Sequence, residues 1–69
     1  MATATYTVTG MTCAHCEMSV REEVEELAGV VGVEVNAGDG TLVVTSAGEI
    51  DDELVVGAVT EAGYSASRA

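Results

Sequence analysis

Cys13 and Cys16 are the two cysteines of this chain and the residues best suited to chemistry. They lie in the segment Gly10–Cys16, which reads GMTCAHC and falls between a predicted strand and a predicted helix. At a helix N-terminus, the backbone amides and the helix dipole favour a thiolate and so lower the pKa of a cysteine. Two thiolates on one side of such a loop form a soft ligand pair for Cu(I), Zn(II) and other thiophilic ions.

Three interpretations of this cysteine pair compete. Inert structural cysteines have no need to flank a polar loop at a helix start, which argues against that interpretation. A CxxC pair beside a strand and helix is also typical of a thioredoxin-like redox site. The chain is too short for that fold, contains no proline or tryptophan, and has Ala14-His15 where that family has a turn-forming pair. We therefore favour a metal site.

The donor set indicates an ion of low coordination number. A closed structural zinc site has four ligands, whereas this segment offers Cys13, Cys16 and, as a third donor, His15. A carboxylate directly before the first cysteine would add a hard ligand for zinc, but Thr12 occupies that position. Two sulfurs suit Cu(I). Because its coordination shell is unfilled, an incoming thiolate can attack the ion, and this favours transfer over storage.

The elements that position the cysteines follow from the apolar pattern. A strand is predicted over Ala4–Thr9, because Tyr6 and Val8 share one face and threonines the other. A helix is predicted from about Ala14 to Ala28, because apolar residues recur at helical spacing among glutamates. Gly29 is a typical helix stop. The apolar stripe of this helix contains Val20, Val24 and Leu27.

The second half of the chain adds two strands joined by a turn, another helix and a last strand. Valines alternate with other residues, which predicts a strand with Val31, Val33 and Val35 toward the core. The glycine-containing turn at 37–40 suits a hairpin. The three predicted strands are 31–36, Thr41–Ser46 and Tyr64–Arg68, and Leu42 and Val44 of the second are expected to point inward. The predicted helix is Ile50–Ala62. Its apolar stripe consists of Ile50, Leu54, Ala58 and Ala62, widened by Val55 and Val59.

The order βαββαβ predicts an α+β, ferredoxin-like sandwich. Four antiparallel strands form one sheet, and two helices cover one of its faces. At 69 residues, the whole chain 1–69 is expected to be a single domain. The other face of the sheet is expected to be in contact with water; it carries Thr5, Thr7, Thr9, Glu34 and Asn36.

Composition excludes several functions. With 12 acidic and 2 basic residues and a net charge of −10, the chain has no basic face for nucleic acid. It has no run of about 20 apolar residues for membrane insertion.

Met1–Gly10 lacks the features of a signal peptide, so we expect a cytoplasmic location. No base, nucleophile and oxyanion arrangement accompanies the thiols, so we expect no enzymatic activity. The acidic excess is typical of proteins that salt stabilises.

Three motifs carry a resemblance to the heavy-metal-associated domain family. The segment Gly10–Cys16 resembles the GMxCxxC signature of that family. Leu27-Ala28-Gly29-Val30 is similar to its Leu-x-Gly-Val after the first helix, and Ala62-Gly63-Tyr64 to its Ala-Gly-Tyr near the end. The resemblance covers essentially the whole chain and implies the βαββαβ fold. The family includes soluble copper chaperones and the N-terminal domains of copper-transporting P-type ATPases.

The resemblance also implies residue roles. Cys13 and Cys16 would be the metal ligands. Met11 would point inward and support the loop from the core, and His15 would face solvent or a partner. Tyr64 would approach the metal from the other side, where it either hydrogen-bonds near a cysteine sulfur or closes the end of the core. The chain lacks the lysines that many members carry near the site.

We therefore expect a cytoplasmic copper chaperone or buffer that binds one Cu(I) and passes it to a CxxC pair on a partner. The resemblance implies a copper-transporting P-type ATPase or a copper-responsive repressor as that partner. The protein is expected to be a monomer, with a metal-bridged dimer as the alternative. The competing predictions are a Zn(II)- or Hg(II)-binding member of the family, a thiol–disulfide oxidoreductase, and one domain of a longer transporter.

Overall fold

A computed structural model describes residues 1–11 and 14–69, with the side chain of residue 14 left out. It contains six elements, in the predicted order βαββαβ. They are β1 (Ala2–Thr9), α1 (Ala14–Glu25), β2 (Val30–Asn36), β3 (Thr41–Ser46), α2 (Asp52–Glu61) and β4 (Ser65–Arg68).

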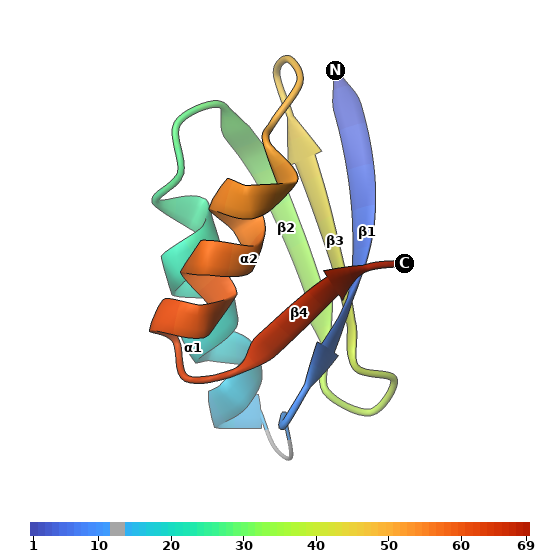
Figure 1. The fold of residues 1–69 in the computed structure, drawn as a ribbon, viewed down its shortest axis with the longest axis vertical. Coiled ribbons are helices and arrows are strands. Elements are labelled where there is room, and N and C mark those ends of the chain that lie inside the picture. Colours follow the sequence, from blue (N-terminus) through green and yellow to red (C-terminus); the bar gives the residue numbers. More distant parts are fainter. Residues whose placement is uncertain (12–13) are drawn as a thin grey trace.

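The four strands form one antiparallel sheet in the order β2-β3-β1-β4. Both helices lie on the same face of this sheet (Figure 1). The predicted ferredoxin-like sandwich is therefore confirmed. Neither helix within residues 1–11 and 14–69 has the length and apolar character needed to cross a membrane.

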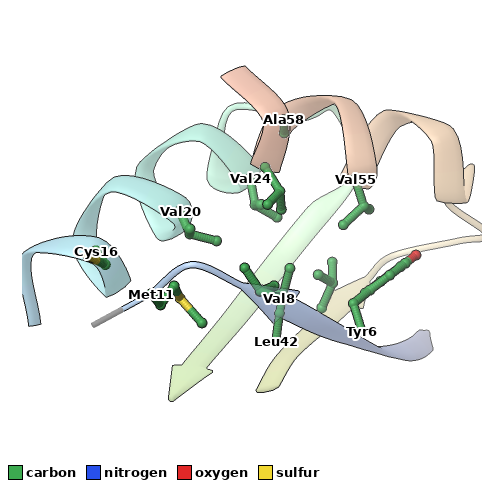
Figure 2. Packing of buried hydrophobic residues seen from close by; sticks show 11 residues of the cluster. Tyr6, Val8, Met11, Cys16, Val20, Val24, Leu42, Val55 and Ala58 are labelled. Carbon is green, nitrogen blue, oxygen red and sulfur yellow. The ribbon is translucent and has the colours of Figure 1, made fainter. Parts of the chain in front are cut away.

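The core lies between the sheet and the two helices (Figure 2). Strands contribute alternate residues and helices contribute one stripe, as the periods of the two structures require. The threonines Thr5, Thr7 and Thr9 are exposed on the other face, as predicted. The side chains with no exposed surface are Tyr6 of β1, Val20 and Val24 of α1, Leu42 and Val44 of β3, and Val55 and Val59 of α2.

Helix α1 ends at Glu25, three residues before the predicted end. The amide of Leu27 donates to the carbonyl of Val24, and the amide of Val30 donates to that of Leu27. These are bonds between residues three apart, so the chain tightens into turns instead of continuing the helix. Leu27 still packs against the core. The apolar pattern therefore extends past the end of the helix, which explains the wrong boundary.

Strand β2 contains an irregularity that reverses its predicted faces. The pairing register with β3 shifts between Val30 and Gly32. An extra residue at such a bulge moves the side chains before it to the opposite face. Val30 packs against the core, whereas Val31 is 59% exposed. The prediction that Val31 faces inward is wrong, and the predictions for Val33 and Val35 are confirmed.

Helix α2 begins at Asp52 instead of Ile50, because Asp51 caps it. The carboxylate of Asp51 accepts a hydrogen bond of 3.0 Å from the amide of Glu53. The helix turns Val55 and Val59 fully into the core and leaves Leu54 53% exposed. The prediction that Leu54 faces the core is therefore wrong. The rest of the predicted stripe is confirmed, because the other members lie in the core or pack against it: Ile50, Val55, Ala58, Val59 and Ala62.

Candidate metal centre

The ligand segment 10–16 connects the end of β1 to the start of α1. Thr12 and Cys13 lie outside the described residues, so the approach of Cys13 to Cys16 stays a prediction. The β2–β3 turn and the connection from α2 to β4 lie at the same end of the molecule (Figure 1). Three connections therefore lie at the end of the molecule where the ion is expected.

Cys16 lies in the first turn of α1, at the boundary between the loop and the core. Its side chain is 8% exposed and belongs to the buried apolar cluster. Figure 2 shows Cys16 and Met11 together at one end of that cluster. The first-turn amides of a helix have no partner within the helix and carry the positive end of its dipole. The helix start therefore favours a thiolate on Cys16, whereas burial in the apolar cluster opposes the charged form.

Two of the roles implied by the resemblance are confirmed by burial. Met11 is 9% exposed and packs within the core cluster, so it supports the loop from inside. His15 is exposed, in agreement with a side chain that faces solvent. Met18, one helical turn further along, is 58% exposed.

Tyr64 lies against the start of the ligand segment. A Cβ atom placed on Gly10 would be 3.3 Å from Cδ1 of Tyr64. Tyr64 is half-buried and packs against the core, so it does close that end of the core. The structure thus brings Tyr64 beside the loop, as the resemblance implies. A hydrogen bond from Tyr64 to a cysteine sulfur stays a prediction.

One contact at this end was not predicted. The carboxylate of Glu17, the residue after Cys16, accepts a hydrogen bond of 2.6 Å from the amide of Ala37 in the β2–β3 turn. In the sequence, Glu17 is one of the glutamates that fill the positions between the apolar residues of this helix, where side chains usually face solvent. No local signal predicts a bond between residues that are 20 positions apart.

The described residues contain no group of three or more His, Cys, Asp or Glu side chains arranged to bind a metal ion. The ligands predicted from the sequence are Cys13 and Cys16, and His15 between them is expected to face solvent or a partner. Of these three residues, the structure describes the side chains of His15 and Cys16. His15 is exposed, and Cys16 is buried.

Comparison with known proteins agrees with the family resemblance of the sequence motifs. The model of the heavy-metal-associated domain family matches residues 5–65. A search of curated proteins finds no match.

Among solved structures, the copper binding domain of HMA7, a P-type ATPase, is 26% identical, with a TM-score of 0.92; the match covers 100% of this chain and 95% of that chain. The N-terminal domain of PacS from Synechocystis PCC6803 is 28% identical, with a TM-score of 0.88; the match covers 100% of this chain and 98% of that domain. The N-terminal domain of ZntA in its apo-form is 36% identical, with a TM-score of 0.87 and coverage of 97% and 90%.

Proposed function

Since this chain belongs to the heavy-metal-associated domain family, we propose that it carries Cu(I) between proteins as a copper chaperone. Cys13 and Cys16 bind one ion. The observation that carries the proposal is the place of Cys16 in the first turn of α1, at the edge of the core and beside buried Met11. The amides and the dipole at the helix start favour a thiolate, and packing against the core limits the movement of the Cys16 side chain.

The chemistry of transfer follows from low coordination. Thiolates are soft ligands that prefer Cu(I) to harder divalent ions. A thiolate of the partner adds to the two-coordinate ion, and one cysteine of this chain then leaves. Each exchange forms one copper–sulfur bond and breaks another, without oxidation or reduction. The ion passes to the partner in two such exchanges, and no enzymatic turnover is involved.

We propose a cytoplasmic monomer whose partner also presents a CxxC pair. A copper-transporting P-type ATPase fits this role, since a copper binding domain of a P-type ATPase shares the fold over the whole of this chain. A copper-responsive repressor is the alternative partner. A metal-bridged dimer of this chain is the alternative to a monomer.

Zinc is the second candidate cargo. The N-terminal domain of ZntA, whose structure is also known in a Zn(II)-form, is 36% identical to this chain. Zinc in proteins is almost always bound by four ligands, and it accepts oxygen and nitrogen donors as well as thiolates. Thr12 stands directly before the first cysteine, where a carboxylate would add such a donor. We therefore rank Cu(I) above Zn(II), and both above Hg(II) and above thiol–disulfide exchange.

A competition titration tests the proposal. The reduced protein is titrated without oxygen with Cu(I) and with Zn(II), each against a chelator of known affinity. We expect about one Cu(I) per monomer, bound far more tightly than Zn(II). Cys13→Ser and Cys16→Ser should each weaken Cu(I) binding by more than about 100-fold, the upper range for loss of an outer-shell partner.

Met18→Leu is the matched control, because it removes an exposed sulfur from the same helix. It should bind Cu(I) as the wild type does. Tight Zn(II) binding with weak Cu(I) binding would favour the zinc alternative. Rapid reduction of insulin disulfides by the metal-free protein would favour the redox alternative.

A further inference from the structure

The β2–β3 turn (residues 37–40) contacts a residue on each side of the ligand segment 10–16. The amide of Val8, in β1, donates a hydrogen bond of 2.7 Å to the carbonyl of Gly40. The amide of Ala37 donates one of 2.6 Å to the carboxylate of Glu17, in α1. Val8 precedes the segment and Glu17 follows it. One turn therefore connects the strand before the cysteines to the helix after them.

This turn is ordered by its own hydrogen bonds. The side-chain oxygen of Asn36 accepts from the amides of Gly38 and Asp39, at 2.8 and 3.3 Å. The amide of Gly40 donates to the carbonyl of Asn36 at 2.9 Å. Gly40 has a φ of +68°, and a Cβ there would lie 2.8 Å from the carbonyl oxygen of Val8. The turn thus presents the Ala37 amide from a fixed position.

Glu17 differs from the other glutamates of α1 in its surroundings. Its carboxylate is bonded to the turn, and its side chain is half-buried. Glu23 is half-buried as well but has no such bond to the turn, and Glu22 and Glu25 are exposed. A hydrogen bond from an amide to a carboxylate is short and strong because the acceptor is charged. Glu17 also shares a peptide unit with Cys16, so the position of one constrains that of the other.

The charge of Glu17 acts against metal binding, which makes its role testable. Two thiolates and one Cu(I) form a unit with a net negative charge. A neighbouring carboxylate raises the energy of that unit and of the free thiolates. If charge were its only effect, removal of Glu17 would strengthen binding. If Glu17 instead positions Cys16, its removal should weaken Cu(I) binding.

We propose that Glu17 is a positioning residue for the metal ligand Cys16. Its carboxylate connects the first turn of α1 to the β2–β3 turn and so limits the movement of Cys16 relative to the end of β1. This inference rests on the proposed function, because it assumes that Cys16 binds the ion. It assigns Glu17 no contact with the metal.

Glu17→Ala and Glu17→Gln separate position from charge. Both remove the negative charge, but only glutamine keeps an oxygen that can accept from the Ala37 amide. We expect Cu(I) affinity to fall by about 10-fold in Glu17→Ala, within the range for loss of an outer-shell partner. Glu17→Gln should bind at least as tightly as the wild type. Thermal melts give the melting temperature of each protein, so that the Cu(I) affinities are compared well below it.

Two further variants act as checks. Ala37→Pro removes the amide donor from the other side of the bond, at the first residue of the turn, a kind of position where proline is common. It should weaken Cu(I) binding as Glu17→Ala does. Glu22→Ala removes the same charge from an exposed site on the same helix. It should leave the affinity within about twofold, because exposed charges are screened by salt.

The outcomes are distinct. The positioning role is overturned if the wild type, Glu17→Ala and Glu17→Gln bind Cu(I) equally tightly, or if both variants bind it more tightly than the wild type. Hydrogen exchange at the Ala37 amide of the metal-free protein provides a test that needs no ion. Exchange should be slow in the wild type and in Glu17→Gln, and fast in Glu17→Ala. If the wild type ignores Cu(I) while this exchange pattern holds, the proposed function fails and the contact stands without a role in metal binding.

Discussion

At the scale of single residues, Gly10 and Tyr64 determine how the chain enters the ligand segment. Gly10 has a φ of +96°, a conformation that L side chains rarely adopt. A Cβ on Gly10 would lie 3.3 Å from Cδ1 of Tyr64, which is closer than ordinary van der Waals contact. Glycine is therefore required here for backbone and for packing reasons together.

Gly10→Ala should destabilise the protein by about 1–2 kcal/mol from the backbone alone. Gly57→Ala is the matched control, since Gly57 lies inside α2 with no atom within 4 Å of its added Cβ. It should stabilise the protein by about 0.5–1 kcal/mol, because alanine is the better helix former. Urea unfolding of the two variants measures both effects. A neutral Gly10→Ala would contradict the positive φ.

At the scale of elements, one polar cluster connects β1, α2 and β4. The hydroxyl of Tyr6 donates to Oδ1 of Asp52 at 2.7 Å. Nη1 of Arg68 donates to both carboxylate oxygens of Asp52, at 2.8 and 2.9 Å. The guanidinium also lies 5.6 Å from the centre of the Tyr6 ring. The four-residue strand β4 is thus linked to α2 as well as to β1.

Titration of this cluster predicts a pH dependence. Burial, and then the hydrogen bond to Asp52, raise the pKa of Tyr6 from 10.0 to about 12. A raised pKa means that the folded state retains the proton which the unfolded state releases. The stabilisation is therefore fully present below pH 10 and is lost as the pH rises to about 12.

Tyr6→Phe measures this contribution. The variant should lose about 1 kcal/mol near pH 7, since one hydrogen bond is removed. The difference in unfolding free energy between wild type and variant should then shrink between pH 10 and about pH 12. Urea unfolding at a series of pH values provides the data. A difference that stays constant across this range would argue against a raised pKa for Tyr6.

At the scale of the whole molecule, net charge opposes folding. The chain carries −10, and one of its two arginines is paired with Asp52. Exposed glutamates include Glu22, Glu25 and Glu26 of the acidic stretch that begins on α1, and the open face of the sheet is largely threonine. Like charges on a small domain repel one another, and this repulsion is weaker in the unfolded chain, where the charges are further apart.

Added salt should therefore raise the melting temperature. Between about 0.1 M and about 1 M salt, the Debye length falls from roughly 10 Å to roughly 3 Å, which screens the repulsion. Circular dichroism melts in sodium chloride measure the change. Glu25→Gln and Glu26→Gln together should give part of the same increase at low salt and a smaller response to added salt. A melting temperature independent of salt would contradict the argument.

Local periodicity in the sequence was sufficient to predict the element order, the sheet and most of the core. Tyr6 and Val8 alternate with threonines, and Val20 and Val24 recur at helical spacing, so each element could bury only one face. The cysteine spacing likewise indicated a soft metal site before any tertiary structure was considered, and the family match agrees with that interpretation.

Tertiary structure decided where local patterns were ambiguous or where distant residues meet. Val31 and Val30 are both apolar, and only the bulge against β3 selected Val30 for the core. Leu54 and Val55 both suit an apolar stripe, and the packing of α2 on the sheet buried the valine. The bond from Ala37 to Glu17 joins segments that local patterns treat separately. Periodicity reports which face a residue prefers, whereas register and long-range hydrogen bonds exist only once the elements have packed together.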